Sequence, residues 1–245
     1  MPHPVPSARE PWPTEAAELE ALQRGLAELA SDAPVWRPVG QPRVGGVFVS
    51  SPTGLVGEGS AGDPCWVAAV VVQGDRTTAS AVVRGEAGAP YATGLLALRE
   101  GALLGRAVRA LAVAPDVLLV NATGRDHPRR AGLALHLGWA LDVPTAGVTD
   151  RPLLGRGEVP AGERGSAAPL VLGDQVVGFS VRTRRRARPV FVHAAWRTDP
   201  EAAREVVLGC AGTSRTPEPL RRARHLARVE RARDEGRLPP GWRDV

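Results

Sequence analysis

Residues 117–149 read VLLVNATGRDHPRRAGLALHLGWALDVPTAGVT, and this stretch decides the fold. Its first four residues are wholly apolar, which is typical of a short strand buried on both faces of a parallel sheet. The middle predicts a helix that begins near Pro128, since proline is tolerated in a first helical turn. Residues 143–149 predict a second strand. The sequence therefore predicts a βαβ unit at the centre of an α/β fold.

The flanking segments extend this unit in both directions. Upstream, Thr14 opens an amphipathic helix, three apolar runs separated by turns predict an antiparallel meander, and residues 94–112 predict a second helix. Downstream, a second meander precedes two more helices. This order predicts a ribonuclease H-like α/β fold with a mixed central sheet flanked by helices. The expected strands are 44–50, 65–73, 77–85, 169–173, 175–183 and 189–193, and the last two helices are 199–210 and 217–236.

The length of the chain sets its expected domain organisation. With 245 residues it can bury one substantial core, so we expect a single domain over residues 14–236. Residues 1–13 hold five prolines, too many for a helix, and are expected to form a flexible N-terminus. Residues 237–245 are expected to form a C-terminal tail.

Charge and composition narrow the class of partner. The formal net charge is +5 and the chain has no lysine, so every basic side chain except histidine is an arginine. Arginine suits forked contacts to phosphate, which favours an anionic partner, although a bias toward arginine codons would give the same charge. The two cysteines lie far apart and suit a reducing compartment. Without an apolar run of about 18 residues or a signal-like start, we expect a cytoplasmic monomer with no membrane contact.

Four stretches carry most of the polar and glycine residues that point to a function. They are VGGVFVS at 44–50, PYATGLLALREG at 90–101, NATGRDHPRRAGLALHLG at 121–138 and TPEPLRRARH at 216–225. In this order and at these separations they resemble the endonuclease V family, nucleases that cut near deaminated bases, chiefly inosine, in DNA or RNA. The resemblance covers most of the chain. It implies a ribonuclease H-like fold and a DNA or RNA partner.

The resemblance also implies a magnesium or manganese site built from four positions, and three of them have changed. Hard divalent cations prefer oxygen ligands, usually carboxylates. The family's first aspartate falls on Phe48, its second acidic position is the retained Glu100, its third falls on Asn121, and its last ligand falls on Arg224. His225 is one step further along the helix, which rotates its side chain by about 100°. We therefore expect metal binding to be weak or absent and cleavage to be slow or lost.

Two alternatives bear on this site. Arg224 could form a forked ion pair with Glu100 in place of the metal. Other acids could rescue the site, but Asp63, Asp126 and Asp150 all lie in predicted turns, where solvated carboxylates are the simpler interpretation.

The parts that recognise nucleic acid are better retained. By resemblance, Tyr91 is an aromatic wedge that enters the duplex beside the damaged base, and it is the only tyrosine of the chain. The pocket for the flipped base is formed by backbone at Gly94, Leu95 and the loop that ends at Gly124. Ala122 replaces a glycine of that loop, and its methyl group could crowd the base.

Histidine and arginine side chains supply the expected phosphate contacts. By resemblance, His127 approaches the scissile phosphate; the alternative is that it caps its own helix. Arg129 and Arg130 are predicted to contact phosphates or to be solvated charges. Five arginines crowd the predicted hairpin tip between two strands, which suits either a phosphate grip or an exposed turn. These five are Arg182, Arg184, Arg185, Arg186 and Arg188.

Three hypotheses follow from these residues. The first is an endonuclease V-like protein that binds nucleic acid at deaminated sites with weak or lost cleavage. The second is a working magnesium-dependent endonuclease that cuts 3′ to inosine. The third is a non-catalytic protein-interaction module. The replaced ligand positions argue against the second hypothesis, and the retained Tyr91 and HPRR segment argue against the third.

Overall fold

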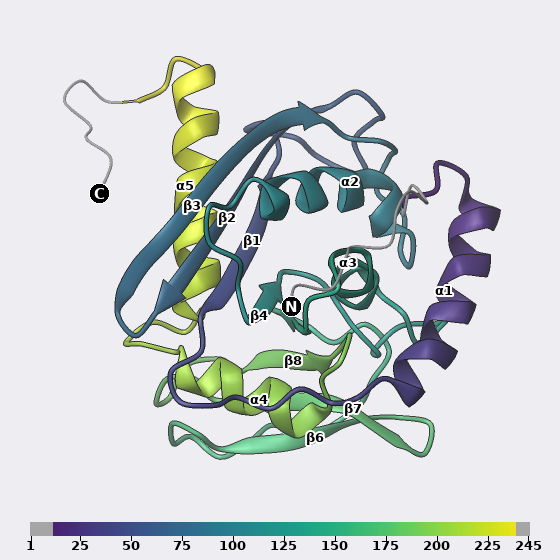
Figure 1. The fold of residues 1–245 in the computed structure, drawn as a ribbon, viewed down its shortest axis with the longest axis vertical. Coiled ribbons are helices and arrows are strands. Elements are labelled where there is room, and N and C mark those ends of the chain that lie inside the picture. Colours follow the sequence, from purple (N-terminus) through teal and green to yellow (C-terminus); the bar gives the residue numbers. More distant parts are fainter. Residues whose placement is uncertain (1–11, 239–245) are drawn as a thin grey trace, which may run out of the picture.

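The structure is a computed structural model that describes residues 12–238, and Figure 1 shows its fold. One sheet of eight strands has the order β3-β2-β1-β4-β5-β8-β7-β6. Most of the expected flexible N-terminus (1–13) and of the tail (237–245) lies outside the described residues. The expected single domain over 14–236 stays a prediction.

The strands follow the predicted pattern. The first meander is antiparallel, and β4 and β5 continue the sheet in parallel from β1. The second meander joins through β8, which pairs antiparallel with β5. The strands are β1 (Val44–Ser50), β2 (Pro64–Gln73), β3 (Arg76–Glu86), β4 (Val117–Val120), β5 (Thr145–Thr149), β6 (Ala167–Leu172), β7 (Gln175–Val181) and β8 (Val190–Ala194).

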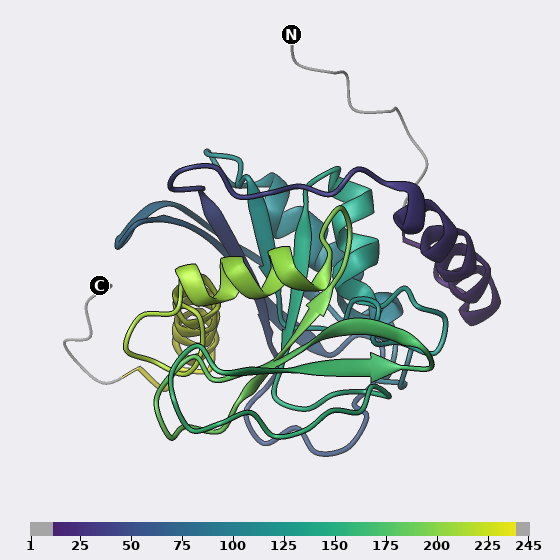
Figure 2. The same ribbon diagram turned by 90° about the horizontal axis from the view of Figure 1, so that it is seen from below.

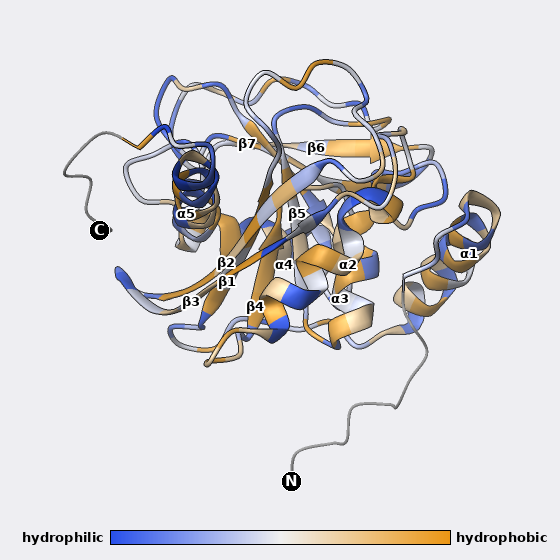
Figure 3. Cartoon of the chain, turned by 90° about the horizontal axis from the view of Figure 1, so that it is seen from above, coloured by the Kyte–Doolittle hydropathy of each residue, from blue (hydrophilic) through white to orange (hydrophobic). Residues whose placement is uncertain are grey.

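Helices cover both faces of the sheet. The core on one face contains α1 (Ala16–Asp32), α2 (Leu96–Arg109) and α3 (Leu133–Leu141), and the core on the other contains α4 (Pro200–Gly209). The fifth helix, α5 (Glu218–Asp234), also packs on this second face, and Figure 3 shows its hydrophilic outer surface in blue. Figures 1 and 2 place α1 and α5 at opposite ends of the molecule.

Strand β4 shows why its sequence is apolar throughout. Leu118 and Val120 pack in the core on the α1–α3 side, whereas Val117 and Leu119 pack in the core that contains α4. Successive side chains of a strand point to opposite faces, so a strand covered on both sides needs an unbroken apolar run. The central strand is therefore predicted by its composition.

Helix α3 begins later than its sequence predicts. The expected start near Pro128 is wrong, because the helix runs from Leu133. The preceding residues form a turn in which Arg130 has a left-handed backbone with φ 57°. Asp126 and His127 are buried there and are held by hydrogen bonds to other segments. These contacts hold residues 126–130 in a loop. The sequence alone, with its proline and two arginines, predicts the first turn of a helix there.

A glycine in β1 explains how α5 approaches the sheet so closely. A Cβ atom at Gly46 would lie 2.3 Å from the carbonyl carbon of Pro219, at the start of α5. Any larger residue would push the helix away from the strand. Within residues 12–238, no helix is long and apolar enough to cross a membrane.

Candidate nucleic-acid site

Two cavities adjoin at the end of β4. The larger cavity has a volume of about 280 Å³ and the smaller one about 190 Å³. Tyr91, Leu96 and Asn121 line both, so a ligand could extend from one into the other. The larger cavity is also lined by Gln23, Gly94, Ala122, Thr123, His127, Leu133, Thr149, Arg151, Pro152 and Leu153, and the smaller one by Val47, Phe48, Val49, Glu100, Leu104 and Val120.

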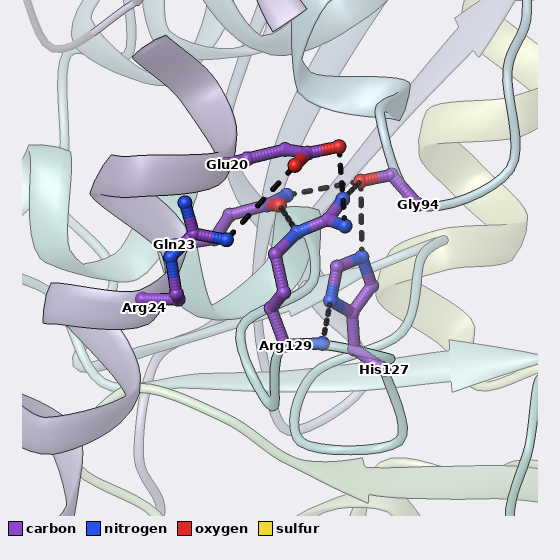
Figure 4. Close-up of polar contacts among 6 residues, drawn as sticks. All are labelled: Glu20, Gln23, Arg24, Gly94, His127 and Arg129. Carbon is purple, nitrogen blue, oxygen red and sulfur yellow. Dashed lines mark hydrogen bonds and ion pairs between the residues drawn. The ribbon is translucent and has the colours of Figure 1, made fainter. Parts of the chain in front are cut away.

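The backbone carbonyl of Gly94 is the most heavily bonded group of the larger cavity. Figure 4 shows it accepting hydrogen bonds from Gln23 Nε2 at 3.1 Å and from Arg129 Nη2 at 3.0 Å, with His127 Nε2 at 3.1 Å. Gly94 has φ +81°, a conformation that glycine adopts without strain. Two segments of the chain, α1 and the loop after β4, therefore fix one peptide group in the wall of the cavity.

The hydrogen bonds of His127 define its protonation. The backbone N–H of Arg129 donates to Nδ1 at 3.2 Å, so the proton of the neutral ring is on Nε2, which donates to Gly94. The pKa of His127 is lowered to about 4, mainly by burial and in smaller part by the Arg129 charge, while the hydrogen bond to Gly94 opposes this shift. Both ring nitrogens are used within the protein, and the predicted contact of His127 with a phosphate stays a prediction.

Arg129 and Arg130 also have partners inside the protein. Arg129 donates from Nε to Gln23 Oε1 at 2.6 Å and pairs with Glu20 at 3.4 Å, and its side chain is only 18% exposed. Arg130 donates from Nη2 to the carbonyl of Leu172 at 2.9 Å. The interpretation as solvated charges is therefore wrong for Arg129. Contacts of either arginine with phosphate are untested.

Gln23 is a cavity residue that the sequence analysis missed. Only 1% of it is exposed, and it reaches Gly94 from α1. The buried positions of α1 are Leu19, Gln23, Leu26 and Ala30, whereas Leu29, expected on the apolar stripe, is 54% exposed. Gln23 is a polar residue at a position of α1 where the helical spacing predicts an apolar one, and this exception could have identified it as a site residue.

Some residues of the predicted backbone pocket line the larger cavity, and others are packed in the core. Gly94 and Ala122 line the larger cavity, as expected. Leu95 packs against the core on the α1–α3 side and does not line either cavity. Gly124 is buried away from both, and a Cβ atom there would lie 2.1 Å from the carbonyl oxygen of Ala194. Its lack of a side chain therefore serves packing against the end of β8.

Tyr91 stands where the two cavities meet. Its side chain is 43% exposed, and its backbone N–H donates to Glu58 at 2.8 Å. An aromatic side chain that is half exposed beside a cavity can stack on a base. The position suits the predicted wedge, whose contact with nucleic acid is untested.

The four positions that the resemblance assigns to metal do not fit a divalent cation. Phe48 offers an aromatic ring, Asn121 a neutral amide, and Arg224 a positive charge. Burial raises the pKa of Glu100 to about 7, which disfavours the charged form that a cation needs. Within residues 12–238, no group of three histidine, cysteine, aspartate or glutamate side chains could hold a metal ion.

Arg224 stacks on Phe48 and does not form the expected pair with Glu100. Its guanidinium carbon lies 5.0 Å from the centroid of the Phe48 ring. Burial lowers the pKa of Arg224, and the charge of Arg228 adds to this effect. His225 is exposed on the other side of α5, as its one-residue offset predicts.

Asp126 is not the solvated turn residue that the sequence suggests. It is 0% exposed, and its carboxylate accepts the backbone N–H groups of residues 153, 154 and 155 at 2.7, 2.9 and 2.7 Å. His193 lies against the same carboxylate, with Nδ1 at 3.6 Å, and its Nε2 is 2.8 Å from Thr149 Oγ1. Asp126 therefore anchors the segment that forms the outer wall of the larger cavity.

The other two turn acids form ion pairs. Asp63 binds the buried Arg99 at 3.0 Å, so its interpretation as a solvated charge is also wrong. Asp150 pairs with Arg215 and is 68% exposed. Neither residue lines the smaller cavity.

The arginine-rich turn between β7 and β8 is mostly exposed. Arg184, Arg186 and Arg188 are exposed, as the prediction of a phosphate grip requires. Arg185 pairs with Glu163 at 3.1 Å. Arg182 instead donates to the carbonyls of Pro160 and Ala161, so it holds the turn. Binding of phosphate by this turn, Arg184 included, is untested.

The comparisons with known proteins all match one family. A family model described as Endonuclease V matches residues 41–225. The chain is 33% identical to an endonuclease V of Roseiflexus castenholzii over 236 residues, which are 96% of this chain and 99% of that protein. Two further endonuclease V proteins align at 46% identity over shorter stretches, 67% and 64% of their own lengths.

Solved structures agree with the sequences. The crystal structure of endonuclease V from Streptomyces avermitilis matches with a TM-score of 0.79 and 37% identity, covering 93% of this chain and 96% of that one. Endonuclease V from Ciona intestinalis, in complex with a 24mer DNA containing an inosine followed by a ribo-adenosine, matches with a TM-score of 0.72 and 21% identity, covering 89% and 98%. The resemblance stated from the motifs and the ribonuclease H-like fold are thereby confirmed.

Proposed function

Because the chain belongs to the endonuclease V family, we propose that it binds DNA or RNA at inosine or another deaminated base and cleaves it weakly or not at all. The observation that carries this proposal is the contrast between two adjoining cavities. The walls of the larger cavity are fixed by buried and partly buried hydrogen bonds. In the smaller one, Phe48 and Asn121 stand at ligand positions.

The chemistry of the larger cavity supports an uncharged ring as its ligand. Apart from Arg151, its polar side chains are the neutral Gln23, Tyr91, Asn121, Thr123 and Thr149, together with His127 in its neutral form. Uncharged hydrogen-bonding groups suit the edge of a base, whereas an anion needs charged partners. Its 280 Å³ is slightly less than the roughly 300–1,000 Å³ of sites for drug-sized ligands, which suits a single base.

The Tyr91 side chain can fill the gap that a base leaves when it moves out of the stack. When a base leaves the stack, an aromatic side chain can occupy the gap and offset part of the lost stacking. The wedge and the cavity share a border, because Tyr91 lines both cavities. The Ciona protein of the same fold binds DNA that contains inosine. We infer the same class of ligand for this chain.

Cleavage by this family requires a divalent cation, and the residues present do not suit one. Glu100 alone cannot supply the charge of several carboxylates. Without a metal, no water of low pKa is generated beside the phosphodiester, so hydrolysis at neutral pH is slow. The proposed function is therefore recognition that is uncoupled from cutting.

Fluorescence anisotropy tests the proposal. Matched DNA and RNA oligonucleotides that differ by one inosine or adenosine are titrated with the protein in EDTA and in Mg²⁺. We expect at least tenfold tighter binding to inosine, with or without metal. Tyr91→Ala should weaken the binding, and Tyr91→Phe should retain it because stacking needs only the ring. Equal affinity for inosine and adenosine would overturn the proposal.

A further inference from the structure

We propose that Arg224 binds a backbone phosphate of the nucleic acid beside the smaller cavity, so that a fixed guanidinium provides the positive charge where the family uses a metal ion. This inference rests on the proposed function. It concerns binding of the phosphodiester and not its hydrolysis. Three observations support it.

The first observation is that the hydrogen-bond donors of Arg224 are unused. Arg224 makes no hydrogen bond or ion pair to any residue between 12 and 238, and its Nε is buried without a partner. Two other arginines that are not exposed do have partners: the buried Arg99 binds Asp63, and the partly buried Arg215 binds Asp150. A buried donor left unsatisfied costs about 1–3 kcal/mol. An anion at the partly exposed guanidinium would accept its N–H groups.

The second observation is that the guanidinium is held in place. Phe48 lies under it at 5.0 Å, and Phe48 also lines the smaller cavity. Stacking on a ring uses the face of the guanidinium and leaves the N–H groups at its edge available. Two parallel N–H groups match two oxygens of a phosphate. The substitution that removes a metal ligand at position 48 thus creates the support for a cation.

The third observation is the charge around Arg224. Arg228 and Arg215 are the nearby cations, and Asp150 is the nearby anion. Asp150 is already paired with Arg215. The charge of Arg224 is therefore not offset by an unpaired carboxylate, which favours a bound anion. Glu100, which lines the smaller cavity, makes no ion pair within the described chain that would compensate Arg224.

The position of the smaller cavity identifies the anion as part of the same strand. The two cavities share Tyr91 and Asn121. A base in the larger cavity and a neighbouring phosphate beside Phe48 would then belong to one oligonucleotide. A phosphodiester meets both requirements, whereas free phosphate meets only the second.

The test is a double-mutant cycle between the protein and the oligonucleotide, carried out in EDTA. The protein is wild type, Arg224→Gln or, as a matched control one turn further along α5, the exposed Arg228→Gln. The inosine oligonucleotide carries a single neutral methylphosphonate at each successive position near the inosine. Melting temperatures confirm that the variants are folded.

We expect Arg224→Gln to weaken binding at least tenfold and to reduce the slope of log affinity against log salt by about one, because one phosphate contact is lost. Arg228→Gln should weaken binding less than threefold. One methylphosphonate should weaken wild type and have little further effect on Arg224→Gln. Arg224→Lys should retain part of the affinity, since it keeps the charge but loses the fork.

Two outcomes would overturn this inference. In the first, Arg224→Gln binds as tightly as Arg228→Gln. In the second, every methylphosphonate weakens wild type and Arg224→Gln equally. If wild type prefers inosine in either case, only the role of Arg224 is lost. If wild type binds no oligonucleotide, the proposed function fails as well.

Discussion

The carbonyl oxygen of Gly94 shows how single residues shape the larger cavity. A Cβ atom at Gly94 would lie 3.3 Å from Arg129 Nη2 and 3.5 Å from His127 Nε2. We predict that Gly94→Ala destabilises the fold by roughly 1–2 kcal/mol, because alanine disfavours φ +81°. We also predict a loss of inosine binding, because the crowded donors must move.

Gly57→Ala is the matched control for this prediction. Gly57 has nearly the same backbone, φ +79°, but nothing lies within 4 Å of its Cβ position. Chemical denaturation should give similar losses of stability for both variants, while only Gly94→Ala loses binding. If Gly57→Ala weakens binding equally, the three hydrogen bonds on Gly94 do not matter for recognition.

His127 gives a prediction for pH. Its pKa is about 4 in the folded protein and about 6.5 in an unfolded chain, so the unfolded state takes up more protons between these values. The free energy of unfolding therefore falls as pH falls through this window. His127 should contribute a loss of about 2 kcal/mol between pH 8 and pH 5.

Urea denaturation of wild type and His127→Gln across this pH range measures that contribution. Glutamine can keep both hydrogen bonds but does not titrate. The curve of the variant should be flatter than that of wild type by about 2 kcal/mol. Parallel curves would mean that His127 is not held neutral by its surroundings.

At the scale of elements, the buried Asp126 connects the loop after β4 to the segment after β5. Its three backbone donors lie in residues 153–155, which continue the cavity wall. Asp126→Asn keeps the shape but turns one acceptor into a donor that faces an N–H group. We predict a loss of stability on the order of 2–4 kcal/mol.

Hydrogen exchange of residues 153–155 localises this effect. Their amides should lose protection in Asp126→Asn. The control is Asp150→Asn, which removes an exposed ion pair worth less than about 1 kcal/mol and should leave these amides protected. Unchanged protection in Asp126→Asn would show that the carboxylate does not hold the loop.

The sequence predicts the elements better than the loops between them. The apolar run of β4 and the helical spacing of leucines follow from burial, which composition records directly. The start of α3 and the role of Asp126 depend on hydrogen bonds to backbone amides of residues 153–155, and a backbone amide has no signature in the sequence. For the same reason, the sequence motif marks Gly124 as a conspicuous glycine, but it does not show that the carbonyl group of Ala194 is the neighbour that leaves no room for a side chain.

At the scale of the whole molecule, the fold brings together residues that are distant in the chain. Gln23 from α1, Gly94 before α2 and Arg129 after β4 converge on one carbonyl group. Phe48 of β1 and Arg224 of α5 meet, and Phe48 lines the smaller cavity together with Tyr91. Motif positions identify Phe48 and Arg224 as replaced ligands, but only the packing of α5 against β1 shows that they contact each other.

The central claim is that recognition and cleavage are separated, and single-turnover cleavage tests it most directly. An inosine oligonucleotide, saturated with protein in Mg²⁺ or Mn²⁺, is followed by denaturing electrophoresis. We predict a stable complex and no product above the buffer control. Nicking 3′ to the inosine by wild type, abolished both by EDTA and by Glu100→Ala, would contradict it.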